Sequence, residues 1–345
     1  MKKYKYISLI FIFTMVMSHP LWSTGNTPVG SSGGEFQKVG SAGSQFLKIG
    51  IGARAIGMGA YGSVCNDLSS IFWNPAGLAE VKGWTAEFDY TQWIAGFNHS
   101  FAAFAMPLGS NFTLGGHLVR FGSKNIQITT FDDPQGSGLY YNVSDICGGI
   151  TLAGYLTDRF SFGATVKYIS NSFTSISANG VAFDIGTKYE TGIQGIRLGF
   201  AIMNLGTQES YSGQDLRFTS KLKDAFYQAP IDAEWITYPF SLPLTFRAGI
   251  SSEVYKDDVQ KVTAAFDFTT MTDVTEQYAL GGEYVWNDLL AIRAGYLMGQ
   301  SQLGFSGGIG IKYVSAGMNG QFDYSMSPTK DFGIVNRISI SLGVK

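Results

Sequence analysis

The stretch Ile49–Glu80 reads IGIGARAIGMGAYGSVCNDLSSIFWNPAGLAE, with five glycines between Gly50 and Gly62 and an Asn-Pro-Ala-Gly turn at Asn74–Gly77. Gly57–Gly62 matches the GxGxxG pattern of dinucleotide-binding loops, but that site needs a βαβ unit around the glycines, and no α/β pattern follows here. The glycines instead predict places where backbone packs closely and side chains would not fit. A compact glycine-dense segment ahead of many short alternating segments predicts a plug in front of a barrel.

From Trp84 onward the chain alternates apolar and polar residues with period 2, which is typical of half-buried strands. We count about fourteen runs of roughly 9–12 residues, the length at which a tilted strand crosses a bilayer. The predicted strands are 84–94, 97–108, 112–124, 145–156, 160–171, 178–190, 196–206, 242–254, 259–270, 276–287, 289–299, 303–314, 317–326 and 334–345.

The connections between these strands alternate between tight and long. Gly109–Asn111 and Thr157–Arg159 are short polar turns, whereas Asn125–Ser144 and Thr207–Ser241 are long. In outer-membrane barrels the tight turns lie at the periplasmic rim and the long loops outside the cell. The fold class that we predict is therefore all-β: a transmembrane antiparallel β-barrel with an N-terminal plug segment. The loop Thr207–Ser241 either contacts another protein or folds over the barrel mouth.

The N-terminus predicts export. Three lysines precede the apolar run Ile7–Met17, which is too short for a membrane-spanning helix, so residues 1–23 are expected to be a signal peptide. Residues 24–83 are expected to form a leader and a periplasmic plug segment, and residues 84–345 the barrel. The predicted location is the outer membrane of a Gram-negative-type bacterium, with its lipid as a partner.

The amino-acid composition limits the classes of function that the protein could have. Charged residues make up 14% of the chain, against about 25% in ordinary soluble domains, and the net charge of -2 offers no basic surface for nucleic acid. The sequence has no nucleophile–base grouping, metal-ligand spacing or cofactor motif, so we expect no enzyme, no metal and no cofactor. Histidine is scarce, and His99 and His117 lie in predicted strands, where a structural role is expected. The sequence does not decide whether Cys65 and Cys147 form a disulfide.

Charged residues at inward strand positions are expected to hydrate and cross-link the lumen rather than to catalyse a reaction. They are Lys167, Asp184, Lys188, Arg247, Asp267, Glu283, Arg293, Lys312, Asp323 and Arg337.

The segment Phe46–Glu80, with LKIGIGARAIGMGAYG followed by SSIFWNPAGLAE, resembles the start of the PorV/PorQ family of outer-membrane proteins. That family is itself similar to the FadL-type transporters of hydrophobic compounds. The resemblance implies a plug motif of Gly52, Ala53, Arg54, Gly57, Gly59, Asn74, Pro75 and Gly77.

Two functions follow from this resemblance. The first is a type IX secretion-associated role, in which the barrel binds or shuttles secreted proteins that carry C-terminal signal domains, together with other secretion components. The alternative is passive transport of long-chain fatty acids or other hydrophobic compounds, with a hydrophobic small molecule in the lumen. Ala60, where the motif often has another glycine, and the non-aromatic C-terminus depart from the family pattern.

Overall fold

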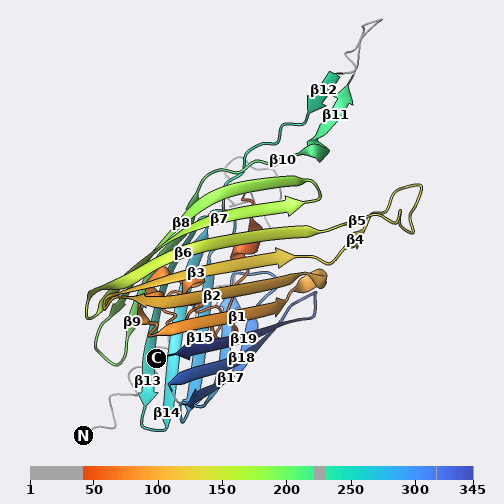
Figure 1. Ribbon diagram of the computed structural model, residues 1–345. Helices are drawn as coiled ribbons and strands as arrows, with labels where there is room; N and C mark the ends of the chain where they lie inside the picture. Colours follow the sequence, from red (N-terminus) through yellow and green to blue (C-terminus); the bar gives the residue numbers. More distant parts are fainter. Residues whose placement is uncertain (1–41, 221–230, 316, 345) are drawn as a thin grey trace, which may run out of the picture. The chain divides into compact units, whose positions relative to one another are not determined.

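The computed structural model describes residues 42–220, 231–315 and 317–344. Its main sheet has 15 strands, one of which is the two-residue β10 (Ser212–Gly213), attached to the edge of β8. The other fourteen form the barrel (Figure 1). They are β1 (Trp84–Gln92), β2 (Asn98–Leu108), β3 (Phe112–Gly122), β6 (Val143–Thr157), β7 (Phe160–Phe173), β8 (Ile176–Glu190), β9 (Arg197–Gly206), β13 (Thr245–Lys256), β14 (Gln260–Met271), β15 (Gln277–Trp286), β16 (Leu290–Met298), β17 (Phe305–Ser315), β18 (Met318–Pro328) and β19 (Ile334–Val344).

The sheet closes on itself. Every barrel strand pairs antiparallel with its neighbours in the chain, and β1 pairs with β19 from Trp84 opposite Val344 to Gln92 opposite Asn336. The long excursion between β9 and β13 does not open the wall, because these two strands pair directly. A closed sheet has no free edge strand, so all strands satisfy their backbone donors and acceptors within the barrel. The predicted closed antiparallel barrel of about fourteen strands is confirmed.

Two rims follow from this topology. The short-turn rim carries the turns after β2, β6, β8, β13, β15 and β17, together with the start of β1 and the end of β19. The long-loop rim carries the connections after β1, β3, β7, β9, β14, β16 and β18. Two hairpins extend from the long-loop rim: β4 (Ile126–Gln127) with β5 (Tyr140–Tyr141), and β11 (Arg217–Ser220) with β12 (Ile231–Glu234) (Figure 1).

The strands bury their polar face and expose their apolar face. On β1, Phe88 and Tyr90 are exposed, whereas Glu87 and Asp89 are buried. This is the reverse of a soluble domain and is the pattern expected of a barrel whose outer face meets hydrocarbon. At outward positions near the long-loop rim, tyrosine hydroxyls donate to asparagine side chains across a hairpin, as Tyr90 does to Asn98 at 2.6 Å.

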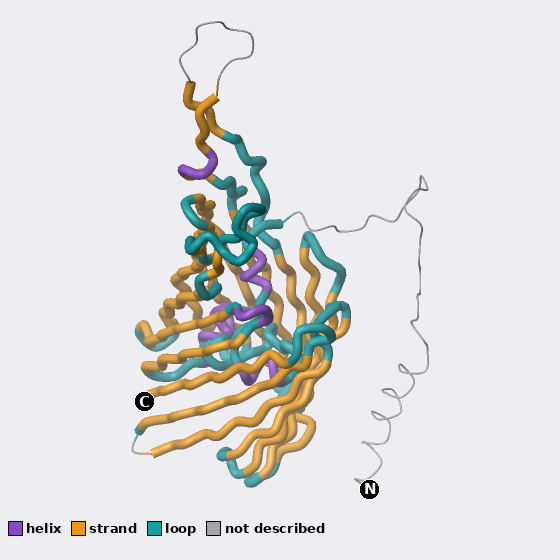
Figure 2. The backbone as a smooth tube through the Cα atoms, turned by 90° about the vertical axis from the view of Figure 1, so that its right-hand side faces the viewer, coloured by secondary structure: helices purple, strands orange, loops and turns teal. Residues whose placement is uncertain are grey.

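Short helices occupy the interior. They are η1 (Gln45–Lys48), α2 (Ala53–Gly57), α3 (Ser70–Trp73) and η2 (Pro75–Glu80), and Figure 2 shows them in purple inside the ring of strands. The remaining short helices, η3 (Ile94–Gly96) and η4 (Gln214–Leu216), lie in loops. No helix within the described ranges is long and apolar enough to cross a membrane.

Candidate functional site

The lumen is occupied by residues 43–81, which we call the luminal segment. Its first residues lie at the long-loop rim, where the Gly43 backbone N–H donates to the Ser241 carbonyl at 2.9 Å. Its last residues lie at the short-turn rim, where Glu80 forms an ion pair with Lys188 near the end of β8. The segment therefore runs through the barrel from one rim to the other.

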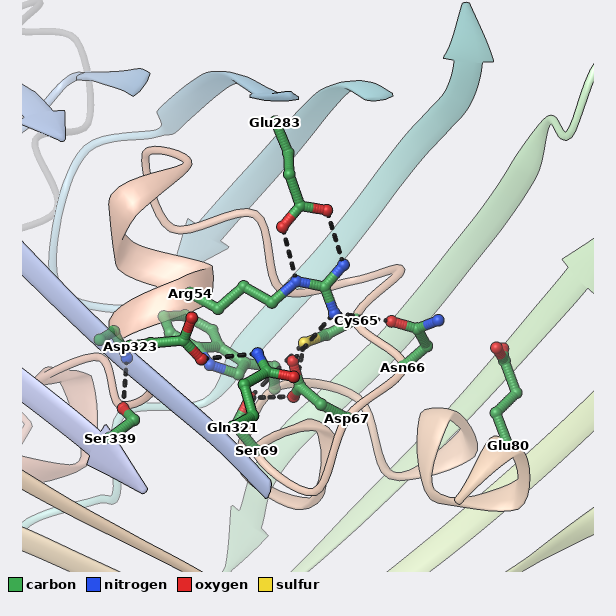
Figure 3. Close-up of polar contacts among 12 residues, drawn as sticks. Arg54, Cys65, Asn66, Asp67, Ser69, Glu80, Glu283, Gln321, Asp323 and Ser339 are labelled. Atoms are coloured by element: carbon green, nitrogen blue, oxygen red, sulfur yellow. Dashed lines mark hydrogen bonds and ion pairs between the residues drawn. The ribbon is translucent and has the colours of Figure 1, made fainter. Parts of the chain in front are cut away.

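Arg54, one of the predicted motif residues, ties the luminal segment to the wall (Figure 3). Its Nε and Nη2 each donate to Glu283 on β15 at 3.0 Å, a bidentate pair. Its Nη1 donates to Asn66 at 3.0 Å and to Asp67 at 3.2 Å within the luminal segment. Burial alone lowers the pKa of Arg54, but the charges of Glu283 and Asp67 outweigh it and hold the pKa well above its ordinary value. Arg54 is therefore a permanent cation that joins two parts of the luminal segment to one strand.

The ion pairs continue along the wall. Glu283 also accepts from Arg293 on β16 at 2.7 Å, and Arg293 donates to Asp323 on β18 at 2.6 Å. Glu283 and Arg293 are directly opposite in the register of β15 and β16. Buried pairs of this kind are costly to break singly, because removal of one partner leaves a charge without compensation. The network fixes the luminal segment against β15–β18.

Glycines make the closest contacts between the luminal segment and the wall. A Cβ added to Gly281 would lie 2.2 Å from the Met58 carbonyl oxygen, and one added to Gly295 would lie 2.1 Å from the Gly59 nitrogen. Gly59 itself has φ +77°, a conformation that favours glycine. Backbone thus packs directly on backbone here, which leaves no room for a nucleotide beside these glycines.

The Asn74–Gly77 turn makes a second contact with the wall, on β7–β9. Asn74 is fully buried; its Nδ2 donates to the carbonyls of Ser63 and Thr187, at 2.6 and 3.1 Å, and its Oδ1 accepts from the Ala76 N–H at 3.1 Å. A Cβ on Gly186 would lie 2.0 Å from Asn74 Oδ1, and one on Gly163 2.3 Å from the Pro75 carbonyl carbon. The turn therefore packs directly on wall glycines, where no side chain lies between the two backbones.

The structure places most of the eight predicted motif residues at these two contacts. Ala53, Arg54, Gly57 and Gly59 face β15–β19, and Asn74 and Pro75 face β7–β9. Gly52 and Gly77 pack within the luminal segment, Gly52 on Ser69. Ala53 donates its N–H to Ser339 Oγ at 2.7 Å, and Gly77 packs on the Cys65 carbonyl. Sequence reasoning missed the wall glycines that receive the motif. Their signal was present, because these glycines occupy inward positions where the alternating pattern calls for a polar side chain.

Of the inward charges expected from the sequence, nine are buried in the lumen, and Lys312 is solvent-exposed near the short-turn rim. Lys167 pairs with Asp184 at 2.8 Å beside a register shift between β8 and β9. His99 and His117 are buried on the inner wall. Cys65 and Cys147 are buried and unbonded, and burial raises the pKa of the Cys65 thiol far above its ordinary value, which makes it unreactive.

A cavity of about 510 Å³ lies between the luminal segment and β13–β19 at the long-loop rim. We call it the rim cavity. Its apolar lining includes Ile49, Ile56 and Leu297, and it is flanked by Trp73 and Trp93. Two strand arginines enter it, each lying over a tryptophan: Arg247 is 4.7 Å from the Trp73 ring centre and Arg337 is 5.8 Å from that of Trp93.

Lys48 and Gln45 anchor the luminal segment beside this cavity. Both donate to Asp273, in the turn after β14, at 2.7 and 2.9 Å. Burial raises the pKa of Asp273, but the hydrogen bonds from Lys48 and Gln45 outweigh it and bring the pKa below its ordinary value. The Asp273 carboxylate therefore neutralises the charge of Lys48.

No protein-family model matches the chain, and no curated protein matches it. Solved structures do. The toluene transporter TbuX of Ralstonia pickettii aligns over 85% of this chain and 97% of its own at 14% identity, with a TM-score of 0.55. The toluene transporter TodX of Pseudomonas putida aligns over the same shares at 13% identity, with a TM-score of 0.56. A FadL homologue of Pseudomonas aeruginosa aligns over 84% and 97% at 13% identity, with a TM-score of 0.51. At these identities the likeness concerns the fold, which is the FadL-like barrel.

Proposed function

We propose that this protein is an outer-membrane channel that admits hydrophobic small molecules through its lumen. The observation that carries the proposal is a closed fourteen-strand barrel whose exposed outer face is apolar and whose interior is filled by an N-terminal segment. The solved barrels of the same fold include toluene transporters and a channel for monoaromatic hydrocarbons. Because long loops face outward in such barrels, the rim cavity would open to the cell surface.

In this proposal the luminal segment controls passage. It occupies the lumen from rim to rim, and its contacts on β15–β18 and β7–β9 close the route in the observed state. Passage requires that one of these contacts give way. The contact around Asn74 is a buried turn on glycines, whereas the one around Arg54 is a network of ion pairs.

The test uses whole cells, because hydrophobic molecules cross a plain lipid bilayer without a channel. The protein is expressed in a Gram-negative strain that lacks transporters of this fold, and the initial uptake of labelled toluene is measured. We expect faster uptake than in cells with an unrelated barrel at equal abundance. Equal uptake in the two strains would refute the proposal.

The secretion role implied by the sequence resemblance stays a prediction. One observation favours it: Trp235, Ile236 and Tyr238 beside the β11–β12 hairpin are exposed, the last two at 93% each. Exposed apolar and aromatic side chains of this kind suit protein contact. Its test is secretion of proteins with C-terminal signal domains in the native host after substitution of these three residues with serine.

A further inference from the structure

The rim cavity carries positive charge that the protein does not compensate. Arg337 is 2% exposed, and its guanidinium has no carboxylate partner within the described residues. Arg247 is 8% exposed and forms no ion pair there, although the Asp267 carboxylate acts on its charge from a longer distance. Among the described residues, Arg337 donates one hydrogen bond, to the Ser327 hydroxyl at 3.1 Å, and Arg247 donates one, to the Thr269 hydroxyl at 3.0 Å. The Nε of Arg337 has no partner in the described part of the chain.

Other cations of the lumen do have carboxylate partners. Arg54 and Arg293 share Glu283, and Lys48 at the cavity wall has Asp273. Asp267, on the strand next to Arg247, accepts from the Ser63 N–H and hydroxyl and also acts on the Arg247 charge through space. A buried charge without a counter-charge is expensive, and a buried N–H without an acceptor adds to that cost. Arg337 at the rim cavity is therefore placed for an anion from outside the chain.

The residues that line the rim cavity indicate the size and the apolar part of such a ligand. Trp93 and Trp73 flank the cavity beside the arginines, and Ile49, Ile56 and Leu297 line it. Its volume of about 510 Å³ lies in the range of small-molecule sites, roughly 300–1,000 Å³. Aromatic rings prefer offset or edge contacts with other rings, and a planar guanidinium fork matches a carboxylate.

We propose that the rim cavity binds a compact aromatic carboxylate, with its carboxylate on Arg337 and its ring against Trp93. This assignment rests on the proposed function, and it adds aromatic organic anions to the neutral hydrophobic molecules that the channel would admit. Arg337 is the contact, because its Nε has no acceptor among the described residues and its side chain is more deeply buried than that of Arg247.

The test measures binding to the purified protein in uncharged detergent by titration calorimetry. The probes are benzoate, its neutral counterpart benzyl alcohol, and octanoate as an aliphatic carboxylate. Benzoate is expected to bind most tightly of the three. Since hydrogen bonds to charged groups are among the stronger ones, Arg337→Gln is expected to weaken benzoate binding about 10- to 100-fold. Arg247→Gln is expected to weaken it less.

Arg120→Gln, on the exposed outer face of β3, is the matched control and is expected to bind benzoate like the wild type. Heat-modifiable migration on a gel checks that each variant is a folded barrel, and Arg337→Lys provides a second variant that keeps the charge and is expected to bind more tightly than Arg337→Gln. Wild-type affinity in Arg337→Gln, equal affinity for benzyl alcohol, tighter binding of octanoate, or no benzoate binding would each overturn the assignment. Toluene uptake by cells is measured separately, so intact uptake without benzoate binding refutes this assignment alone, and benzoate binding without uptake refutes the channel.

Discussion

Gly281 and Gly282 are neighbours on β15 and face opposite sides of the wall, which makes them a matched pair for testing how the luminal segment is held. A Cβ on Gly281 would lie 2.2 Å from the Met58 carbonyl oxygen, so this contact must open by about 1.2 Å to reach the 3.4 Å of ordinary van der Waals contact. A Cβ on Gly282 meets nothing closer than 3.9 Å. Overpacking of this kind costs about 1–3 kcal/mol, whereas replacing a strand glycine in open space with alanine stabilises by about 0.5–1 kcal/mol.

Hydrogen exchange of the luminal segment measures this difference. The Gly59 and Ala60 amides donate to the Ile56 and Ala55 carbonyls at 2.9 and 3.0 Å and report directly on the contact. Since about 1.4 kcal/mol is a tenfold change, Gly281→Ala should speed their exchange by about 5- to 150-fold. Gly282→Ala should leave it unchanged. If the two variants exchange at the same rate, the close contact between luminal segment and wall does not hold the segment in place.

Three further predictions concern the other anchors. Arg54→Gln removes one of two cations from the buried Glu283, so it should weaken the luminal segment by about 1–3 kcal/mol, and a double-mutant cycle with Glu283→Gln, read by the same amide exchange, should show coupling rather than additivity. Asn74→Asp keeps the shape of the side chain but removes both N–H donors, so it should loosen the turn more than Asn74→Ala; equal protection in the two variants would contradict the donor role. Asp273 has a lowered pKa, so the stability it contributes is present above its ordinary pKa of 3.8 and is lost as the pH falls through the lower folded value. Unfolding of wild type and Asp273→Asn in denaturant should therefore differ at pH 6 and converge as the pH falls through the lowered pKa; a constant difference would contradict the Lys48–Asp273 anchor.

Most of the barrel could be predicted from the sequence because its signal is local. Period-2 alternation gives the strands, and each expected span agrees with an observed strand to within three residues at either end. The path of the luminal segment could not be obtained in this way, because it depends on tertiary contacts such as the Gly43–Ser241 hydrogen bond that places its start at the long-loop rim.

Only part of the candidate site could be predicted from the sequence, because the rest also depends on tertiary contacts. Arg54 and Asn74 stand out in the sequence, but their partners Glu283 and Thr187 are separated from them by more than a hundred residues. Lys312 alternates inward like its neighbours and yet is exposed, because it lies close to a rim. Arg337 has no carboxylate partner in the described part of the chain, and this depends on which residues surround it in the fold, which no local sequence pattern indicates.

The central claim is that hydrophobic solutes pass through the lumen only when the luminal segment moves. A reversible lock tests it: Ser63→Cys with Gly249→Cys places a luminal residue next to the wall, where a Cβ on Gly249 lies 2.8 Å from that of Ser63. A disulfide needs about 3.8 Å between these atoms, so the contact has to open by about 1 Å. In cells expressing the double variant, toluene uptake should fall to background when the disulfide forms and return on addition of a reductant. In cells expressing either single variant, uptake should not change on oxidation or reduction. Uptake that continues unchanged in the fully oxidised protein would contradict the account.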